Sequence, residues 1–201
     1  MTDRPASPSH ALAELLAGNH RFVSGDRIHP NQDAERRTAL ADAQNPFAVV
    51  LGCSDSRLAA EIIFDRGLGD LFVVRTAGHV VSPEVLGSIE YAVTVLHTPL
   101  VVVLGHDSCG AVRATREAVS GDASPAGHLR SVVDAVAPSV RVAAERRIED
   151  VDGIVDVHIG RTVELLRSRS DVIGAAVDSG NCAVVGMYYR LSAGRVRIVG
   201  E

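Results

Sequence analysis

Two short polar clusters in the sequence hold residue types that bind metal ions. One contains Cys53, and the other contains His106 and Cys109. Two thiolates and one imidazole form a donor set that zinc accepts in tetrahedral geometry, and three protein ligands leave the fourth position free for chemistry. Zinc with a free position lowers the pKa of a bound water molecule to about 7, which makes hydroxide available at neutral pH. The residues therefore predict a catalytic zinc site with one Zn2+ per chain.

The spacing of the second cluster supports this interpretation. His106 and Cys109 are three residues apart at a loop that opens a predicted helix, and the positive end of a helix favours a thiolate. Other interpretations stay open, because a Cys after a strand is often a small buried hydrophobe. Cys53 and Cys109 could also form a redox pair or belong to a non-catalytic zinc site, although a structural zinc usually has four Cys or His ligands.

Asp55 and Arg57 lie beside Cys53. On an open surface such an ion pair contributes only about 0 to 1 kcal/mol. In a pocket, the carboxylate can orient a water molecule or accept its proton, and the guanidinium can hold the carboxylate by paired hydrogen bonds. Asp55 and Arg57 are therefore candidate catalytic residues if they lie in a pocket, and a surface ion pair otherwise.

In the sequence around these clusters, short apolar runs alternate with stretches that have a helical pattern. This alternation is typical of an α/β fold with a mainly parallel central sheet and flanking helices. Ligands in such folds bind beyond the carboxyl ends of the strands, so both polar clusters are expected to meet at one edge. The expected strands cover residues 47–51, 71–74, 100–104, 183–189 and 195–199, and the expected helices cover residues 12–25, 32–44, 59–66, 83–96, 108–119, 128–136, 140–147 and 151–169.

Local signals sharpen several of these elements. The run 100–104 is continuous and β-branched, which predicts a central strand. Ser82 followed by Pro83 is a strong helix start, and Pro138 is expected to separate two helices. The last two strands are expected to form a C-terminal hairpin through the turn at 192–194.

The length of 201 residues and a hydrophobic content of 46% predict one domain, 1–201, with a large core. Within it we distinguish an N-terminal helical arm, 1–45, from a zinc-binding α/β core, 46–201. The helix in this arm has an apolar stripe that is predicted to pack on a partner subunit. The stripe consists of Leu12, Leu15, Leu16, Asn19, Phe22 and Val23.

Charge and hydropathy exclude some partners. The net charge of -5 gives no global positive field for nucleic acid or anionic lipid. The apolar runs are far shorter than the roughly 20 residues of a membrane span, and the first residues lack the apolar stretch of a signal peptide. We therefore expect a cytoplasmic protein with no nucleic acid or membrane partner, whose three cysteines stay reduced.

Together these motifs resemble the β-class carbonic anhydrases of bacterial type. The resemblance is based on Cys53-Ser54-Asp55-Ser56-Arg57, Val73-Val74-Arg75-Thr76-Ala77-Gly78 and Gly105-His106-Asp107-Ser108-Cys109-Gly110, and it covers nearly the whole chain. It implies a homodimer or a dimer of dimers, with the active site near the subunit interface. It also implies reversible hydration of carbon dioxide to bicarbonate by zinc-bound hydroxide; hydrolysis of carbonyl sulfide or carbon disulfide is the alternative on the same fold.

Carried over by position, the resemblance implies Cys53, His106 and Cys109 as the zinc ligands. Asp55 would be the proton acceptor, oriented by Arg57, and a possible fourth ligand in a closed state of the site. The sequence departs from the family pattern at four positions. Thr76 and His79 replace Asn, Arg66 replaces a frequent Gln, and Val50 replaces the Trp that some members use in a non-catalytic bicarbonate pocket.

The remaining candidates have weaker patterns. His79 is interpreted either as a proton shuttle or, with greater weight, as a hydrogen-bonded structural residue. Cys182 has no partner at metal-binding spacing and is expected to be a core thiol. The other histidines are expected on the surface or in packing contacts, namely His10, His20, His29, His97, His128 and His158.

Overall fold

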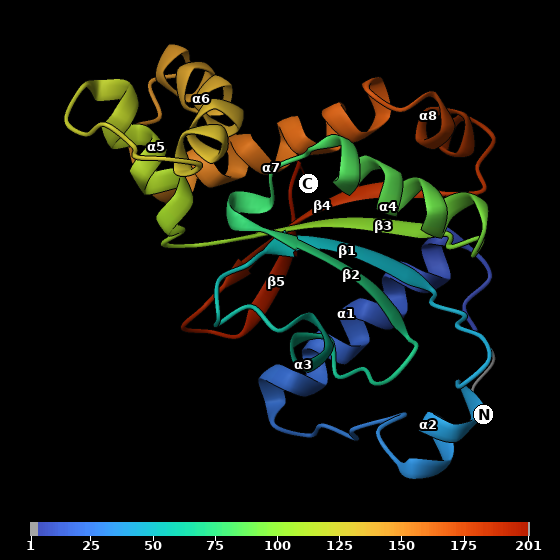
Figure 1. Cartoon of the computed structure of the whole chain (residues 1–201). Helices are drawn as coiled ribbons and strands as arrows, with labels where there is room; N and C mark the ends of the chain where they lie inside the picture. The colour runs from blue at the N-terminus through green and yellow to red at the C-terminus, as the bar shows by residue number, and fades with distance from the viewer. Residues whose placement is uncertain (1–3, 201) are drawn as a thin grey trace.

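One five-stranded sheet forms the centre of the computed structural model, which describes residues 4–200 (Figure 1). The strand order is β2-β1-β3-β4-β5; the first four strands are parallel, and β5 pairs antiparallel with β4. This arrangement confirms the predicted mainly parallel sheet and its C-terminal hairpin. The strands are β1 (Ala48–Cys53), β2 (Leu71–Thr76), β3 (Leu100–His106), β4 (Ala183–Arg190) and β5 (Arg195–Ile198).

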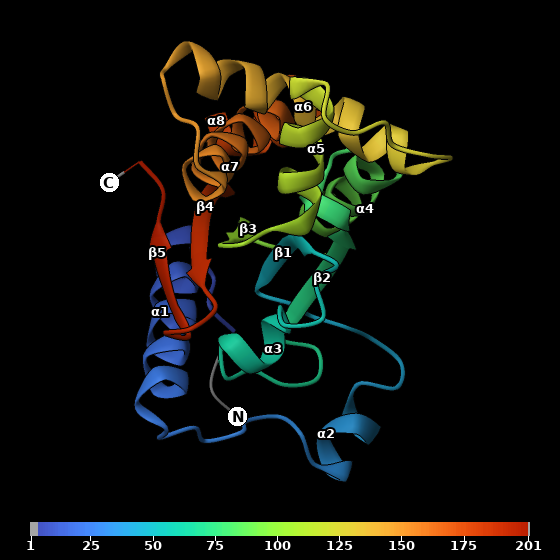
Figure 2. The same cartoon turned by 90° about the vertical axis from the view of Figure 1, so that its left-hand side faces the viewer.

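Helices cover both faces of this sheet. On one face α4, α7 and α8 lie over the strands, and α5 and α6 pack beside α7 (Figures 1 and 2). On the other face lie α1 and α3. The helices are α1 (Pro8–Ser24), α2 (Ala34–Ala39), α3 (Ala60–Ile63), the 3-10 turn η1 (Ala77–His79), α4 (Pro83–Thr94), α5 (Gly110–Ser120), α6 (Leu129–Glu145), α7 (Val151–Ser168) and α8 (Asp171–Asp178).

Strand β3 is central, as its continuous apolar run predicts, and all of its residues are buried. It extends to His106, two residues beyond the expected end, because Gly105 and His106 continue the parallel pairing with β4. Helix α7 packs closely over this end of the strand. A Cβ atom at Gly105 would lie 2.6 Å from Cδ1 of Ile159, so a larger residue here would force the Ile159 side chain of α7 to move. This close approach brings α7 near the end of β3.

The helix-start signals are confirmed. The hydroxyl of Ser82 accepts the Val85 N–H at the start of α4, and Pro83 occupies the first turn. Helix α1 ends at Gly25 in a left-handed conformation with φ 85°.

The expected break at Pro138 is wrong. Helix α6 continues through this residue, because buried side chains on both sides of it, including Val133, Val136 and Val140, form one uninterrupted apolar face. Their burial outweighs the hydrogen bond that proline cannot donate. Helix α8 was not expected; Ser170 caps it by accepting the Ile173 N–H. The helices expected over 32–44 and 59–66 are shorter in the structure.

The helical arm buries its inner face on its own chain. In α1, Leu15 and Asn19 are buried, and the helix contacts α3, β3 and β5 (Figure 2). The rest of the apolar stripe, including Leu12, Leu16 and Val23, is half-buried or exposed, so its packing on a partner subunit stays a prediction. Within the arm, α1 therefore packs on the core, whereas α2 has no buried residues. No helix within residues 4–200 combines the length and apolar character needed to cross a membrane.

Candidate metal centre

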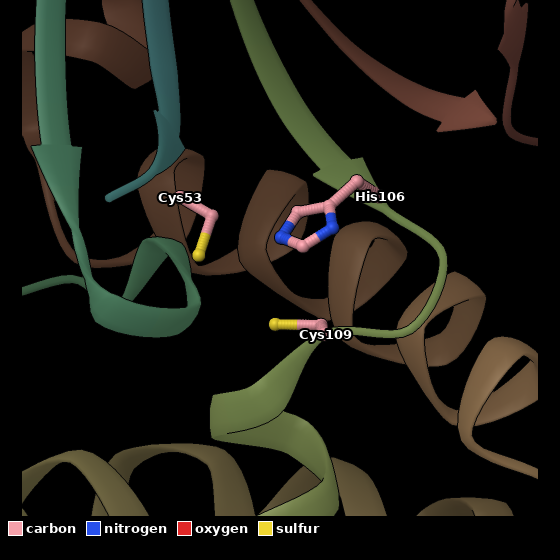
Figure 3. Close-up of side chains that lie close together, drawn as sticks. All are labelled: Cys53, His106 and Cys109. Carbon is pink, nitrogen blue, oxygen red and sulfur yellow. The ribbon is translucent and has the colours of Figure 1, made fainter. Parts of the chain in front are cut away.

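The two polar clusters meet at one edge of the sheet, as predicted. Cys53 ends β1 and His106 ends β3, and these two strands are parallel neighbours. Cys109 is the N-cap residue of α5. The three side chains point toward a common centre (Figure 3), and their donor atoms all lie within 4.8 Å of one another. All three residues are buried.

The loop between His106 and Cys109 is held by long-range contacts. The Asp107 carboxylate accepts the Leu191 N–H at 2.6 Å, and the Asp107 N–H donates to the Tyr189 carbonyl. Ser108 has a positive φ of 55°, and its N–H donates to the Asp152 carboxylate. These contacts anchor the loop to β4 and α7, so the position of Cys109 depends on distant parts of the chain.

The imidazole of His106 is oriented for metal binding. Its Nδ1 lies 2.8 Å from the Asp107 carbonyl, which can only accept, so Nδ1 carries the proton. The other nitrogen, Nε2, is buried and has no hydrogen-bond partner among the described residues. A buried nitrogen lone pair without a donor is costly unless a ligand satisfies it. The orientation is that of a histidine that binds zinc through Nε2.

The sulfur atoms of Cys53 and Cys109 lie close together. The hydrogen bond from Cys109 lowers the pKa of Cys53 to about 4, and the same contact raises the pKa of Cys109. The Gly78 N–H, 3.4 Å from the Cys53 sulfur, also favours the thiolate. A divalent cation between them would stabilise both sulfurs as thiolates. The donor set therefore fits zinc.

Asp55 and Arg57 form a two-point ion pair at the rim of this site. Arg57 Nε donates to Asp55 Oδ1 at 2.9 Å, and Arg57 Nη2 donates to Oδ2 at 2.7 Å. These contacts hold the pKa of the Asp55 carboxyl well below its usual range. Asp55 Oδ2 lies 3.9 Å from His106 Nε2, so the carboxylate faces the metal centre.

Arg75 is a site residue for which the sequence analysis assigned no role, although it lies in one of the quoted motifs. Its Nε donates to the Cys53 carbonyl at 3.1 Å, and its Nη2 donates to the Asp55 carbonyl at 2.6 Å. It therefore fixes the backbone that carries both the thiolate and the carboxylate.

Two buried histidines lie behind the centre. His79 is 0% exposed, and neither of its ring nitrogens has a hydrogen-bond partner in the described part of the chain. The hydrogen-bonded role expected for it is therefore wrong. Its ring centroid lies 4.4 Å from that of His158, which is also buried. Burial lowers the pKa of both side chains, that of His158 to about 4.

The other singled-out residues lie outside the centre. Cys182 is buried just before β4, at the amino-terminal end of the strand and so away from the metal centre at the carboxyl ends. Burial raises its pKa to about 11. Arg66 bonds to the Glu14 carboxylate of α1 at 2.6 Å. The Thr76 hydroxyl donates to the Val80 carbonyl, and Val50 is buried within β1.

Comparisons with known proteins support the interpretation of this site as a metal centre. A family model described as carbonic anhydrase matches residues 48–196. A carbonic anhydrase of Mycolicibacterium smegmatis is 51% identical and covers 96% of this chain and 94% of its own length. Carbonic anhydrase 2 of Mycobacterium tuberculosis is 52% identical, with 94% of this chain and 91% of that protein covered. Tetrameric β-carbonic anhydrases of Sordaria macrospora superpose with a TM-score of 0.76 at 26% identity, over 94% of this chain and 97% of that one.

The fold and the Cys/His/Cys centre define a zinc-dependent lyase. The chain belongs to the carbonic anhydrase family and is of the bacterial β class. Members of this class use zinc to interconvert carbon dioxide and bicarbonate, which is the activity of this protein.

Proposed function

We propose that this protein hydrates carbon dioxide reversibly at one zinc ion held by Cys53, His106 and Cys109. The observation that carries the assignment is the convergence of two thiols on the buried Nε2 of His106, which no group within residues 4–200 satisfies. Bound zinc is a Lewis acid that lowers the pKa of water and so supplies a nucleophile at neutral pH.

Asp55 supports the reaction by accepting a hydrogen bond. Its Oδ1 is occupied by the N–H and Nε of Arg57, whereas Oδ2 receives one bond from Arg57 and faces the metal centre. A carboxylate with a depressed pKa stays ionised and accepts a bond only from a protonated oxygen. Asp55 thus selects and orients a protonated oxygen of the substrate or of water.

Arg57 is the anchor that keeps this acceptor in place. The paired bonds limit rotation of the Asp55 side chain, as fork-shaped contacts between guanidinium and carboxylate do. In the closed state that we propose as the alternative, Asp55 leaves Arg57 and becomes the fourth metal ligand, so that substrate chemistry stops. The conformation described here is the paired one.

The assembly that we propose is a homodimer or a dimer of dimers. Strand β2 is at the edge of the sheet, and Tyr91 of α4, which packs beside Phe72 of this strand, stays exposed, as does Val95 after the helix. The similar Sordaria macrospora proteins are described as tetrameric. Contacts of α1 with β3 and β5 support one domain, 1–201, in which the arm 1–45 and the core 46–201 fold together.

We also propose a cytoplasmic location. The three cysteines are free, and two of them must stay reduced to act as metal ligands.

The proposal is tested by carbon dioxide hydration in a stopped-flow indicator assay. We expect activity to disappear when a chelator removes zinc and to return when zinc is added back. Undiminished hydration by metal-free protein would contradict the proposal. Carbonyl sulfide and carbon disulfide serve as comparison substrates; faster turnover of either would assign the site to the hydrolase activity instead.

A further inference from the structure

A buried chain of hydrogen bonds connects α6 and α7 to the metal centre. The Ser139 hydroxyl of α6 lies 2.8 Å from His158 Nδ1, and His158 Nε2 of α7 lies 2.9 Å from the Gly78 carbonyl. The Gly78 N–H in turn points at the Cys53 sulfur, 3.4 Å away. Ser139, His158 and Gly78 are all buried.

The chemistry of the partners determines the direction of each bond. The Gly78 carbonyl can only accept, so His158 Nε2 carries the proton. His158 Nδ1 is then the acceptor for the Ser139 hydroxyl. Burial lowers the pKa of His158 to about 4, so the imidazole is neutral at physiological pH. The chain thus holds one tautomer of His158 and fixes the peptide between Gly78 and His79, which shares the Gly78 Cα atom with the preceding peptide, whose N–H faces Cys53.

The backbone at Gly78 needs such support. Gly78 has a φ of 66° and His79 a φ of 41°, both in the left-handed region, which is unfavourable for a residue with a side chain. A Cβ atom at Gly78 would lie 3.0 Å from that of Ala111, so this peptide is also tightly packed. The His79 ring rests on the His158 ring. His158 therefore contacts both left-handed residues.

We propose that His158 is a positioning residue for the metal centre: by binding the Gly78 carbonyl, it restrains the left-handed backbone of Gly78, so that the N–H of the preceding peptide stays directed at the Cys53 sulfur and supports the orientation and charge of this thiolate. The proposal rests on the assignment of Cys53 as a metal ligand. An N–H bonded to a metal-binding thiolate withdraws charge from sulfur, and groups of this kind tune metal affinity although they do not touch the metal.

The proposal predicts a loss of zinc affinity when the contact to Gly78 is removed. His158→Leu is expected to weaken zinc binding about 10- to 100-fold, the usual effect of losing a group that orients a metal ligand. In the cobalt-substituted protein, the thiolate-to-cobalt charge-transfer band is expected to move to longer wavelength, because sulfur regains the charge that the N–H withdrew. Zinc affinity is measured by competition with a chromophoric chelator, independently of activity.

Two further variants separate positioning from packing. His158→Gln keeps an N–H donor at the place of Nε2 and is expected to restore the affinity and the band. Ser139→Ala removes only the hydroxyl that selects the tautomer and is expected to shift the band less. Ser170→Ala is the matched control, because Ser170 is an equally buried serine with a side-chain hydrogen bond, to Glu90, far from the metal centre.

Three outcomes would overturn the proposal. These are a folded His158→Leu protein with unchanged zinc affinity and band, a His158→Gln protein that behaves like His158→Leu, and a Ser139→Ala protein that cannot be distinguished from Ser170→Ala. If His158→Leu does not fold, the other variants decide. Cys53→Ser distinguishes the two levels of the argument: if it keeps zinc, the ligand assignment fails, whereas if it loses zinc and His158→Leu does not, only the positioning role fails.

Discussion

Two regions of the core bury polar side chains, and they do so in opposite ways. Between α1 and β5, the buried Asn19 amide is fully paired. Its Nδ2 donates to the carbonyls of Ile63 and Gly194, and its Oδ1 accepts the N–H of Val196. Every polar atom of this side chain has a partner from its own chain. Asn19 thus joins the helical arm to α3 and the C-terminal hairpin, which is a structural role.

At the metal centre, by contrast, a buried ring nitrogen lacks a partner. His106 Nε2 has none within residues 4–200, and the thiols of Cys53 and Cys109 face it across a short gap. Leaving a buried polar atom unpaired costs about 1 to 3 kcal/mol. The comparison teaches that pairing within the chain identifies the polar groups that stabilise the fold, and that converging unpaired groups identify those reserved for a ligand.

The largest effect is expected from removing a ligand. Cys109→Ser should lose zinc and, with it, carbon dioxide hydration, because an alcohol is a poor zinc ligand at neutral pH. Elemental analysis of the purified, folded protein checks this result. Cys182→Ser is the matched control, since Cys182 is also buried but lies at the opposite end of the parallel strands. Full zinc occupancy in Cys109→Ser, or loss of zinc in a folded Cys182→Ser, would reverse the assignment.

Next in size is the effect of releasing Asp55. Arg57→Ala should keep its zinc and lower kcat/KM about 100-fold, because a misplaced acceptor costs that order of rate. Steady-state kinetics together with metal analysis separate the two properties. Unchanged kcat/KM would remove the ion pair from the mechanism.

Acid is expected to lower the unfolding free energy through the core region beside the metal centre, where two neutral imidazoles are buried. The pKa of His158 is about 4 in the fold and 6.5 ordinarily, so the unfolded chain binds a proton first as the pH falls. Its contribution to stability is therefore complete above pH 6.5 and is lost toward pH 4, by about 3 kcal/mol. His79 adds to this effect in the same direction; His158 and His106 face it.

Urea unfolding of wild type and His158→Gln across this pH range measures the effect. Both proteins lose zinc in acid, so the difference between their slopes isolates His158. We expect the variant to have the shallower dependence of unfolding free energy on pH. Equal slopes would show that His158 is charged in the folded protein.

The smallest effect is expected in the region between α1 and β5, where the polar side chain is fully paired. Asn19→Ala leaves buried backbone groups of β5 and α3 unpaired, so unfolding free energy should fall by about 2 kcal/mol. Zinc content per folded chain should stay the same. A selective loss of zinc would mean that the two regions are coupled and that the distinction drawn between them is wrong.

The sequence predicts the metal centre well because its signals are local. Cys53 and His106 end apolar runs, and parallel pairing of those runs brings them together. Long-range contacts are not visible in this way. His158 binds a carbonyl 80 residues away, so the sequence pattern places it only in an apolar helix face. Asn19 belongs by spacing to an apolar stripe, and only the packed structure reveals its three hydrogen bonds.

Pro138 illustrates the same limit for the fold. Its local preference favours a break, whereas the apolar faces on both sides of it are buried together, and this burial keeps α6 continuous.

X-ray absorption at the zinc edge tests the central claim most directly. We predict a zinc coordinated by two sulfurs at about 2.3 Å, one imidazole nitrogen and one further light atom, measured at about pH 8.5 on the purified protein. In Cys109→Ser, any zinc that remains should have at most one sulfur neighbour. A wild-type spectrum with no sulfur, with one sulfur, or with four sulfur and nitrogen ligands from the protein would contradict a three-ligand catalytic site formed by Cys53, His106 and Cys109.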